Sequence, residues 1–393
     1  MRALLLVGLL AAVGWAQTGE CAGCHAGIAA AYGRTAMARS FQTVVPGMEL
    51  PEFGGQRFGH VASGQTFTAV RREGRYFLRR ETDGGIEKEV HYVFGSGNHA
   101  RSFLHRTDSG LLVELPLTLY RDAWAMSPAF DRADHPGFTR EISFQCFFCH
   151  NAYPAVRDDG PGASAVFPAK LPEGIDCQRC HGPGEAHAKS GGKAAIVNPG
   201  KLDKARQLEV CLQCHLETTS LRLPAQLSRP GRGVFSYRPG EPLGDYAVHF
   251  SNAGLAGAFD FVSAATRMRE SACFRKSEGR MTCTSCHDPH TVQRGAAFDG
   301  ACRSCHTTLA AGHTTAGDCG TSIRSSPSTR LPKTGFTKSP RGRWSSSEST
   351  IFPIFTPSAT NWPTASPTPA SSCSPTPGTW RTWRPRPLST TRC

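Results

Sequence analysis

The chain has 393 residues, of which 16 are cysteines and 15 are histidines, and its formal net charge is +13. Residues 320–393 contribute ten basic residues and one acidic residue, Glu348, so residues 1–319 hold 34 basic and 30 acidic residues. A nearly balanced main part does not support the nucleic-acid binding that the overall charge would suggest. We therefore expect no nucleic-acid partner.

The first 16 residues have the three parts of a secretory signal peptide. Arg2 supplies the positive charge, residues 4–13 form the apolar stretch, and residues 14–16 end in a small-residue cleavage site. The apolar stretch is too short to span a bilayer. The alternative is a buried N-terminal helix, but a cysteine motif follows the cleavage site almost at once. We expect a periplasmic or otherwise exported protein with no transmembrane segment after cleavage.

The unit Cys-x-x-Cys-His occurs six times and accounts for twelve of the sixteen cysteines. This unit is the attachment signature of c-type haem, in which two thiols add to the porphyrin vinyl groups and the adjacent histidine binds iron. The sequence therefore predicts six covalently attached haems. The predicted linking cysteines are Cys21, Cys24, Cys146, Cys149, Cys177, Cys180, Cys211, Cys214, Cys283, Cys286, Cys302 and Cys305. The predicted proximal iron ligands are His25, His150, His181, His215, His287 and His306.

Three other uses of paired cysteines explain the pattern less well. Zinc ribbons do not require a histidine directly after the second cysteine. A thioredoxin-type site occurs once, beside a βαβ pattern, and not in six copies. Disulfides in a secreted protein leave the six histidines without a role. Covalent haem is the one interpretation that gives a role to both cysteines and the histidine of every unit.

The long interval between the first two motifs has a different pattern. Short β-type runs at 66–70, 75–78, 89–94 and 111–115 are separated by turn-forming residues. They predict a small antiparallel sheet, whereas residues 26–40 are predicted as a helix. The segment 95–106 holds His99, Arg101 and His105 after two glycines. We interpret the histidines as distal iron ligands or surface residues, and the arginines as partners of haem propionates.

Distal iron ligands are also expected among the remaining histidines. His187 follows its own motif too closely to bind the other face of the same haem, and His290 stands in the same relation to the fifth motif. His249 is a weaker candidate. The alternatives are solvent-exposed or propionate-binding histidines. Five haems in residues 146–319 leave little protein for a conventional apolar core.

We therefore predict a mainly α chain with little regular secondary structure, a multihaem core and a small antiparallel β insertion. Residues 320–393 are rich in Ser, Thr, Pro and Arg, which indicates a disordered tail. Because this tail also holds four tryptophans, an out-of-frame product is the other interpretation. The expected parts are a signal peptide at 1–16, the first motif and helix at 17–45, a β-rich insertion at 46–145, a five-haem domain at 146–319 and the tail at 320–393.

The chain resembles multihaem cytochromes c of the nitrite reductase and hydroxylamine oxidoreductase lineage, through the closely spaced motif pairs and residues 180–187 and 286–290. Residues 95–106, 172–176 and 235–242 resemble a bacterial subfamily in which such a haem domain precedes tetratricopeptide repeats. The resemblance covers about residues 21–319, and the repeats are missing beyond it. It implies partner binding by such repeats in relatives. The Cys-x-x-Cys-Lys variant of the nitrite reductases is absent, so that activity is not implied.

Electron transfer between redox partner proteins is the leading functional hypothesis. The rival is an enzyme in which one haem lacks a distal side chain and acts on a small nitrogen or sulfur compound. His99, Arg101 or His105 would then supply protons and charge. A scaffold that recruits a partner is the third class.

Overall fold

The computed structural model describes residues 18–82, 84–97, 100–120, 123–154, 164–216, 226–252, 265, 268–269, 271–306 and 351–354. The predicted signal peptide and most of the predicted tail lie outside these residues. In the described ranges no helix combines the length and the apolar character needed to cross a membrane.

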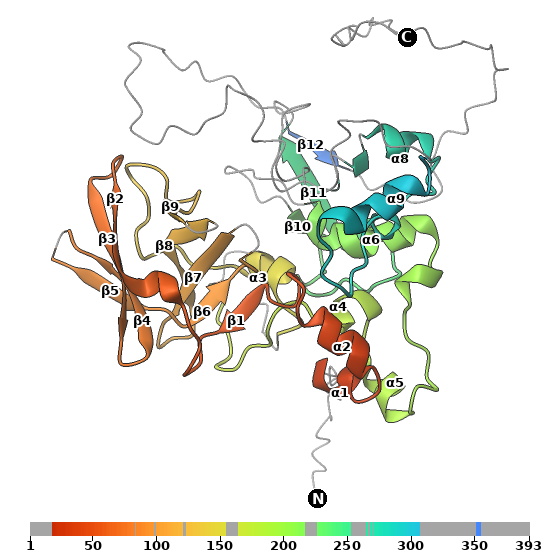
Figure 1. Ribbon diagram of the computed structural model, residues 1–393, viewed down its shortest axis with the longest axis horizontal. Helices are drawn as coiled ribbons and strands as arrows, with labels where there is room; N and C mark the ends of the chain where they lie inside the picture. Colours follow the sequence, from red (N-terminus) through yellow and green to blue (C-terminus); the bar gives the residue numbers. More distant parts are fainter. Residues whose placement is uncertain are drawn as a thin grey trace, which may run out of the picture. The chain divides into compact units, whose positions relative to one another are not determined.

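Within the described residues the strands form three antiparallel sheets (Figure 1). The first sheet has the order β2-β3-β4-β5, the second β1-β6-β7-β8-β9 and the third β10-β11-β12. The strands are β1 (Phe41–Thr43), β2 (Gly54–His60), β3 (Gln65–Arg72), β4 (Arg75–Arg80), β5 (Ile86–Glu89), β6 (Tyr92–Phe94), β7 (Ala100–Arg106), β8 (Leu112–Tyr120), β9 (Ala123–Met126), β10 (Gln226–Ser228), β11 (Ala247–Asn252) and β12 (Ile351–Ile354).

The first two sheets share one hydrophobic cluster. In β4, Tyr76 and Leu78 are buried while Arg75 and Arg79 are exposed, which is the alternation that a strand with one covered face requires. Residues from both sheets join the cluster, among them Phe67, Tyr76, Leu78, Phe103, Leu115 and Leu117. Burial of these large side chains stabilises the two sheets against each other.

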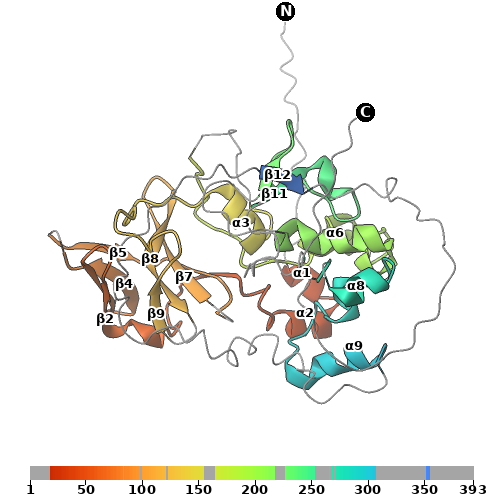
Figure 2. The ribbon, with the colours of Figure 1, turned by 90° about the horizontal axis from the view of Figure 1, so that it is seen from above.

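The helices are short. They are α1 (Thr18–Ala22), α2 (Ala26–Tyr32), α3 (Phe144–His150), α4 (Gln178–His181), α5 (Glu185–Lys189), α6 (Lys204–His215), α8 (Ala272–Lys276) and α9 (Asp299–Arg303), with 3-10 turns η1 (Pro51–Phe53), η2 (Pro199–Lys201), η3 (Leu243–Asp245), η5 (Cys283–Ser285) and η6 (Gly295–Phe298). Leu208, Leu212 and Leu216 from α6 and its end form another cluster, against which Phe274 of α8 packs. Figure 2 shows α6 and α8 next to each other.

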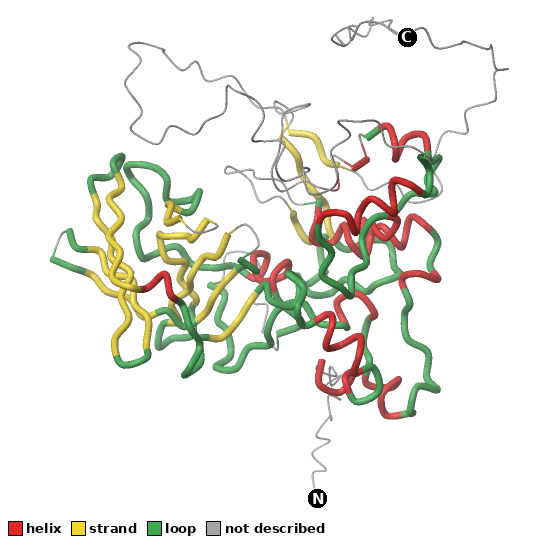
Figure 3. The backbone as a smooth tube through the Cα atoms, viewed as in Figure 1, coloured by secondary structure: helices red, strands yellow, loops and turns green. Residues whose placement is uncertain are grey.

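The prediction of a mainly α fold is wrong, because strands and not helices organise the chain between residues 41 and 126 (Figure 3). The expected small insertion is in fact two sheets of four and five strands. The error arose because six haem motifs suggested many helices, whereas each motif needs only one helical turn. Within the tail that was expected to lack structure, residues 351–354 form β12, which pairs with β11.

The predicted strand runs are found as strands, whereas the predicted helix is shorter than expected. The runs at 66–70, 75–78 and 111–115 lie in β3, β4 and the start of β8, and the run at 89–94 is divided between β5 and β6. The helix predicted for 26–40 ends at Tyr32. Gly33 follows it, and the chain then turns until β1 begins at Phe41. A glycine at the end of a helix favours termination.

The five-stranded sheet also packs on the second motif. Phe41 of β1 and Phe147 of α3 have ring centroids 4.8 Å apart, and Phe147 meets Phe167 at 4.7 Å. Phe147 occupies a variable position of the second Cys-x-x-Cys-His unit and is fully buried. The sheet therefore positions one of the predicted haem-binding segments.

Candidate haem sites

Each motif folds as about one helical turn. In four motifs the histidine N–H donates to the carbonyl oxygen of the first cysteine at 2.9 Å: His25 to Cys21, His181 to Cys177, His287 to Cys283, and His306 to Cys302. The remaining two motifs lie within α3 and at the end of α6. Residues three and four positions apart share one side of a helix. Both sulfurs and the imidazole of a motif therefore face the same side.

Thiols of different motifs lie against one another. Cys177 of the third motif lies close to Cys21 of the first, and burial together with that neighbour raises the pKa of Cys177 to about 12. Cys211 of the fourth motif lies close to Cys283 of the fifth, and this neighbour together with burial raises the pKa of Cys211. Both pairs join the first cysteines of two motifs that are far apart in the sequence.

Further contacts connect the remaining motifs. Burial raises the pKa of Cys180 to about 12, and Cys214 of the fourth motif adds to the effect. Burial also raises the pKa of Cys286, with Cys302 of the sixth motif as the next cause. His150 of the second motif lies close enough to His215 for the two imidazoles to influence each other. Every motif thus has a neighbouring motif within the described residues.

His290 lies beside a predicted proximal ligand. Its ring centroid is 6.1 Å from that of His181, and the two ring planes differ by 21°. Two imidazoles that bind one metal from opposite sides, each through a nitrogen about 2 Å from it, place their centroids roughly 6 Å apart. The spacing of this pair therefore fits one iron between the two rings.

A hydrogen bond orients the His181 ring, and a carboxylate lies near the His290 ring. Nδ1 of His181 bonds the Val197 carbonyl at 2.8 Å. Nδ1 of His290 lies 3.6 Å from the Asp288 carboxylate. A carbonyl or carboxylate on one ring nitrogen fixes the tautomer and leaves the other nitrogen as the metal ligand. The donor set thus fits a haem iron bound by Nε2 of both histidines.

The second motif is covered by the β-rich part of the chain. The ring of Phe94, at the end of β6, lies 4.1 Å from that of His150. Ser40 donates its hydroxyl to the His150 carbonyl at 2.7 Å and accepts at its own carbonyl from Gly95 N–H, also at 2.7 Å. Burial lowers the pKa of His150 to about 4, and Nδ1 is buried with no partner in the described part of the chain. A buried neutral imidazole with an unused nitrogen is suited to a metal.

Two other candidate distal ligands are oriented by the protein or buried. Nδ1 of His187 bonds the Ala194 carbonyl at 2.7 Å, which leaves Nε2 as the ligating atom. His249 in β11 is 2% exposed, and burial lowers its pKa to about 4. Its Nε2 has no hydrogen-bond partner in the described ranges. No contact with a motif histidine identifies the iron that either residue would bind.

Two of the three residues proposed for an open catalytic haem, Arg101 and His105, lie on β7 and have partners in the β-rich part of the chain. His99 lies outside the described residues. The Arg101 guanidinium pairs with Glu52 at 3.1 Å. Nδ1 of His105 bonds the Glu89 carbonyl at 2.9 Å. Arg101 and His105 are therefore engaged with the β-rich part of the chain.

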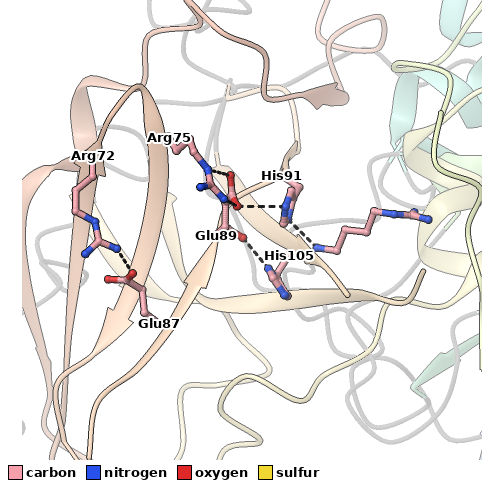
Figure 4. A network of polar contacts seen from close by, with 7 residues as sticks. Arg72, Arg75, Glu87, Glu89, His91 and His105 are labelled. Atoms are coloured by element: carbon pink, nitrogen blue, oxygen red, sulfur yellow. Dashed lines mark hydrogen bonds and ion pairs between the residues drawn. The ribbon is translucent and has the colours of Figure 1, made fainter. Parts of the chain in front are cut away.

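His105 belongs to a polar network on the sheets (Figure 4). Its ring centroid lies 5.1 Å from that of His91, whose Nε2 is 3.6 Å from the Glu89 carboxylate. Arg75 forms an ion pair with the same carboxylate. His91 Nδ1 accepts the backbone N–H of Arg106 at 3.0 Å, so the neutral ring donates from Nε2. Burial lowers the pKa of His91 and so favours the neutral ring, although the Glu89 carboxylate acts in the opposite direction.

The β-rich part is expected to lose stability in mild acid. Burial lowers the pKa of His91 and of His135 below the ordinary value of 6.5. The unfolded chain then binds protons that the folded chain does not, so the contribution is complete above pH about 7 and is lost as the pH falls through about 6.5. Hydrogen exchange of β5 to β7 at pH 7.5 and 5.5 measures the change. His91→Gln should reduce the difference; equal protection at both pH values in the unmodified protein would contradict this expectation.

The sequence analysis did not single out one buried side chain of the third motif. Arg179 lies between the two cysteines of the third motif and is 1% exposed. Variable positions of such motifs commonly face solvent, so nothing in the local pattern indicates burial. The only feature of the sequence that could have drawn attention to this residue is its charge, because an arginine needs an acceptor when it is buried.

Comparison with known proteins finds only low similarity in structure and sequence. No family model matches, and no curated protein matches. The outer cell wall cytochrome OcwA has a TM-score of 0.41 at 18% identity, over 59% of this chain and 44% of that one. The undecaheme cytochrome from the S-layer of Carboxydothermus ferrireducens has a TM-score of 0.36 at 16% identity, over 79% of this chain and 44% of that one. The chain thus spans less than half the length of either cytochrome.

Proposed function

We propose that the chain is an exported multihaem cytochrome c that carries electrons along six covalently bound haems. The observation that carries the proposal is the contact between Cys-x-x-Cys-His motifs distant in the sequence, such as Cys21 with Cys177 and Cys211 with Cys283. Neighbouring attachment points place bound groups near one another. Haem supplies one-electron chemistry when bound.

In this proposal the twelve motif cysteines attach the haems and the six motif histidines bind iron from the proximal side. His290 is the distal ligand opposite His181, because the two rings have the required spacing. His187 and His249 are further distal ligands, supported by the oriented Nδ1 of the first and the unpartnered Nε2 of the second. Histidine on both sides of an iron closes it to substrates, which suits electron transfer.

We further propose a periplasmic or other exported location and redox proteins as partners. The N-terminal sequence pattern supports export. The motif pairs support a relation to the nitrite reductase and hydroxylamine oxidoreductase lineage.

The enzyme alternative receives no support from the described contacts. Arg101 would have to leave Glu52, and His105 would have to leave the Glu89 carbonyl, before either could serve an open haem. The first departure breaks an ion pair and the second a partly buried hydrogen bond. We therefore favour electron transfer.

The first test is the haem content and spin state of the protein produced with a c-type haem maturation system. A pyridine haemochrome assay with intact mass should give six haems per chain. Low-temperature EPR should show low-spin ferric haem throughout, and cyanide or nitric oxide should not bind. A high-spin haem that takes up either ligand would replace electron transfer by a reductase or oxidase function. A chain without covalent haem would exclude both functions.

A further inference from the structure

Arg179 is a buried cation at the meeting point of three motifs. Its guanidinium carbon lies 4.0 Å from the ring centroid of Phe148, a variable residue of the second motif. Nη2 donates to the Phe148 carbonyl at 2.7 Å and lies 3.9 Å from Sγ of Cys214 in the fourth motif. The side chain thus extends from the third motif to the second and the fourth.

The guanidinium is incompletely satisfied. Nε and Nη1 are buried and have no hydrogen-bond partner among the residues that the structure describes. Arginine remains charged at any relevant pH. A buried charge without an acceptor costs several kcal/mol, which is rarely tolerated. Nε and Nη1 lie on different edges of the guanidinium, so each can donate on its own to a carboxylate oxygen.

In the described part of the chain, no carboxylate lies within hydrogen-bond distance of Nε or Nη1. The ring of Tyr153 lies 4.8 Å from the guanidinium carbon and that of Phe235 lies 5.9 Å away. Asp176 is engaged elsewhere: it accepts the backbone N–H groups of Gln178 and Arg179 at 3.1 and 3.2 Å, at the start of α4. The rings of Phe148, Tyr153 and Phe235 therefore surround the cation together with Sγ of Cys214, and Arg238 lies 5.6 Å from the Tyr153 ring.

We propose that Arg179 binds a propionate carboxylate of a haem held by the second, third or fourth motif, and that its charge raises the reduction potential of that haem. This inference rests on the proposed function. The guanidinium contacts Phe148 of the second motif and Cys214 of the fourth, so a haem attached to these motifs would bring its propionates close to it. In a medium of low dielectric a fixed cation favours the reduced, less positive iron.

Redox titration of the haem-loaded protein tests the effect on potential. Arg179→Gln removes the charge, leaves the carboxylate uncompensated and should lower the potential of at least one haem. The expected shift is a tenfold change in the oxidised-to-reduced ratio, or about 59 mV for a one-electron couple. Arg179→Lys keeps the charge and should recover most of the shift.

Arg75→Gln is the matched control, because it removes the same charge from a guanidinium that is 59% exposed and paired on the β-rich part. Its potentials should equal those of the unmodified protein. If Arg179→Gln carries six haems and its potentials do not move, the proposal is overturned while the electron-transfer function stands. If the unmodified protein carries no haem, the function itself fails.

A structure of the unmodified haem-loaded protein decides the matter even if the variants do not mature. We expect a propionate oxygen within hydrogen-bond distance of Nε or Nη1 of Arg179. Asp176 rotated onto the guanidinium, or a solvent anion in that place, would overturn the assignment. The same structure identifies which of the three motifs holds the haem whose propionate binds Arg179.

Discussion

Replacing His290 by alanine is expected to convert one of the six haems from low-spin to high-spin iron. The ring of His290 lies 6.1 Å from that of His181, the spacing of two ligands on one metal. Without it the iron bound by His181 has no side chain on its distal side. The open position should then accept cyanide or carbon monoxide, which the unmodified protein does not bind.

EPR of the ferric protein and optical titration with cyanide measure this change. The number of covalent haems should stay at six, because His290 is not part of a Cys-x-x-Cys-His unit. His60→Ala is the control, since His60 is a buried histidine that bonds Ser63 and Asp131 on the sheets. Unchanged spin states in His290→Ala would show that another residue is the distal ligand of the iron bound by His181.

Local signals in the sequence predicted local structure. A Cys-x-x-Cys-His unit spans five residues, so the hydrogen bond from His181 N–H to the Cys177 carbonyl forms within a single turn. The β-type runs were visible for the same reason, because alternation is a property of a few successive residues. The number of strands and their division into two sheets were not predictable, since pairing such as that of β1 with β6 joins distant segments.

The haem sites show the same limit. His290 was selected as a distal ligand from its position after the fifth motif, but its neighbour His181 belongs to the third motif and is defined only by the fold. Arg101 was expected to face a haem because it follows two glycines. The fold directs it to Glu52 instead. Arg179 was overlooked because burial of a charge depends on residues from other segments, among them Phe148 and Cys214.

Among the glycines that the structure describes, Gly174 is where replacement by alanine is expected to cause the largest loss of stability. Gly174 has φ +53°, and a Cβ at this position would lie 2.0 Å from the Ala38 carbonyl oxygen. That oxygen belongs to the backbone and cannot move aside. The segment 172–176, which was noted in the sequence for its family resemblance, would have to separate from residues 37–41.

Three hydrogen bonds would be lost in that separation. Gly174 N–H donates to the Phe41 carbonyl at 2.9 Å, Ile175 N–H to the Met37 carbonyl at 3.0 Å, and the Tyr32 hydroxyl to the Ile175 carbonyl at 2.8 Å. Together with the unfavourable φ we expect a loss on the order of 4 kcal/mol in the free energy of unfolding. The contact joins the helix after the first motif to the approach to the third, so haem loading at both should fall.

Denaturant unfolding followed by circular dichroism, with the haem count per chain, measures both effects. Gly47→Ala is the matched control, because Gly47 also has a positive φ of +88° but no atom lies within 4 Å of its Cβ position. It should lose only about 1 kcal/mol, the cost of the left-handed backbone. If the two variants are equally stable, the backbone at 174 does not meet the backbone at 38. The first and third motifs would then be held together by their haems and the Cys21–Cys177 contact, rather than by the segment that precedes the third motif.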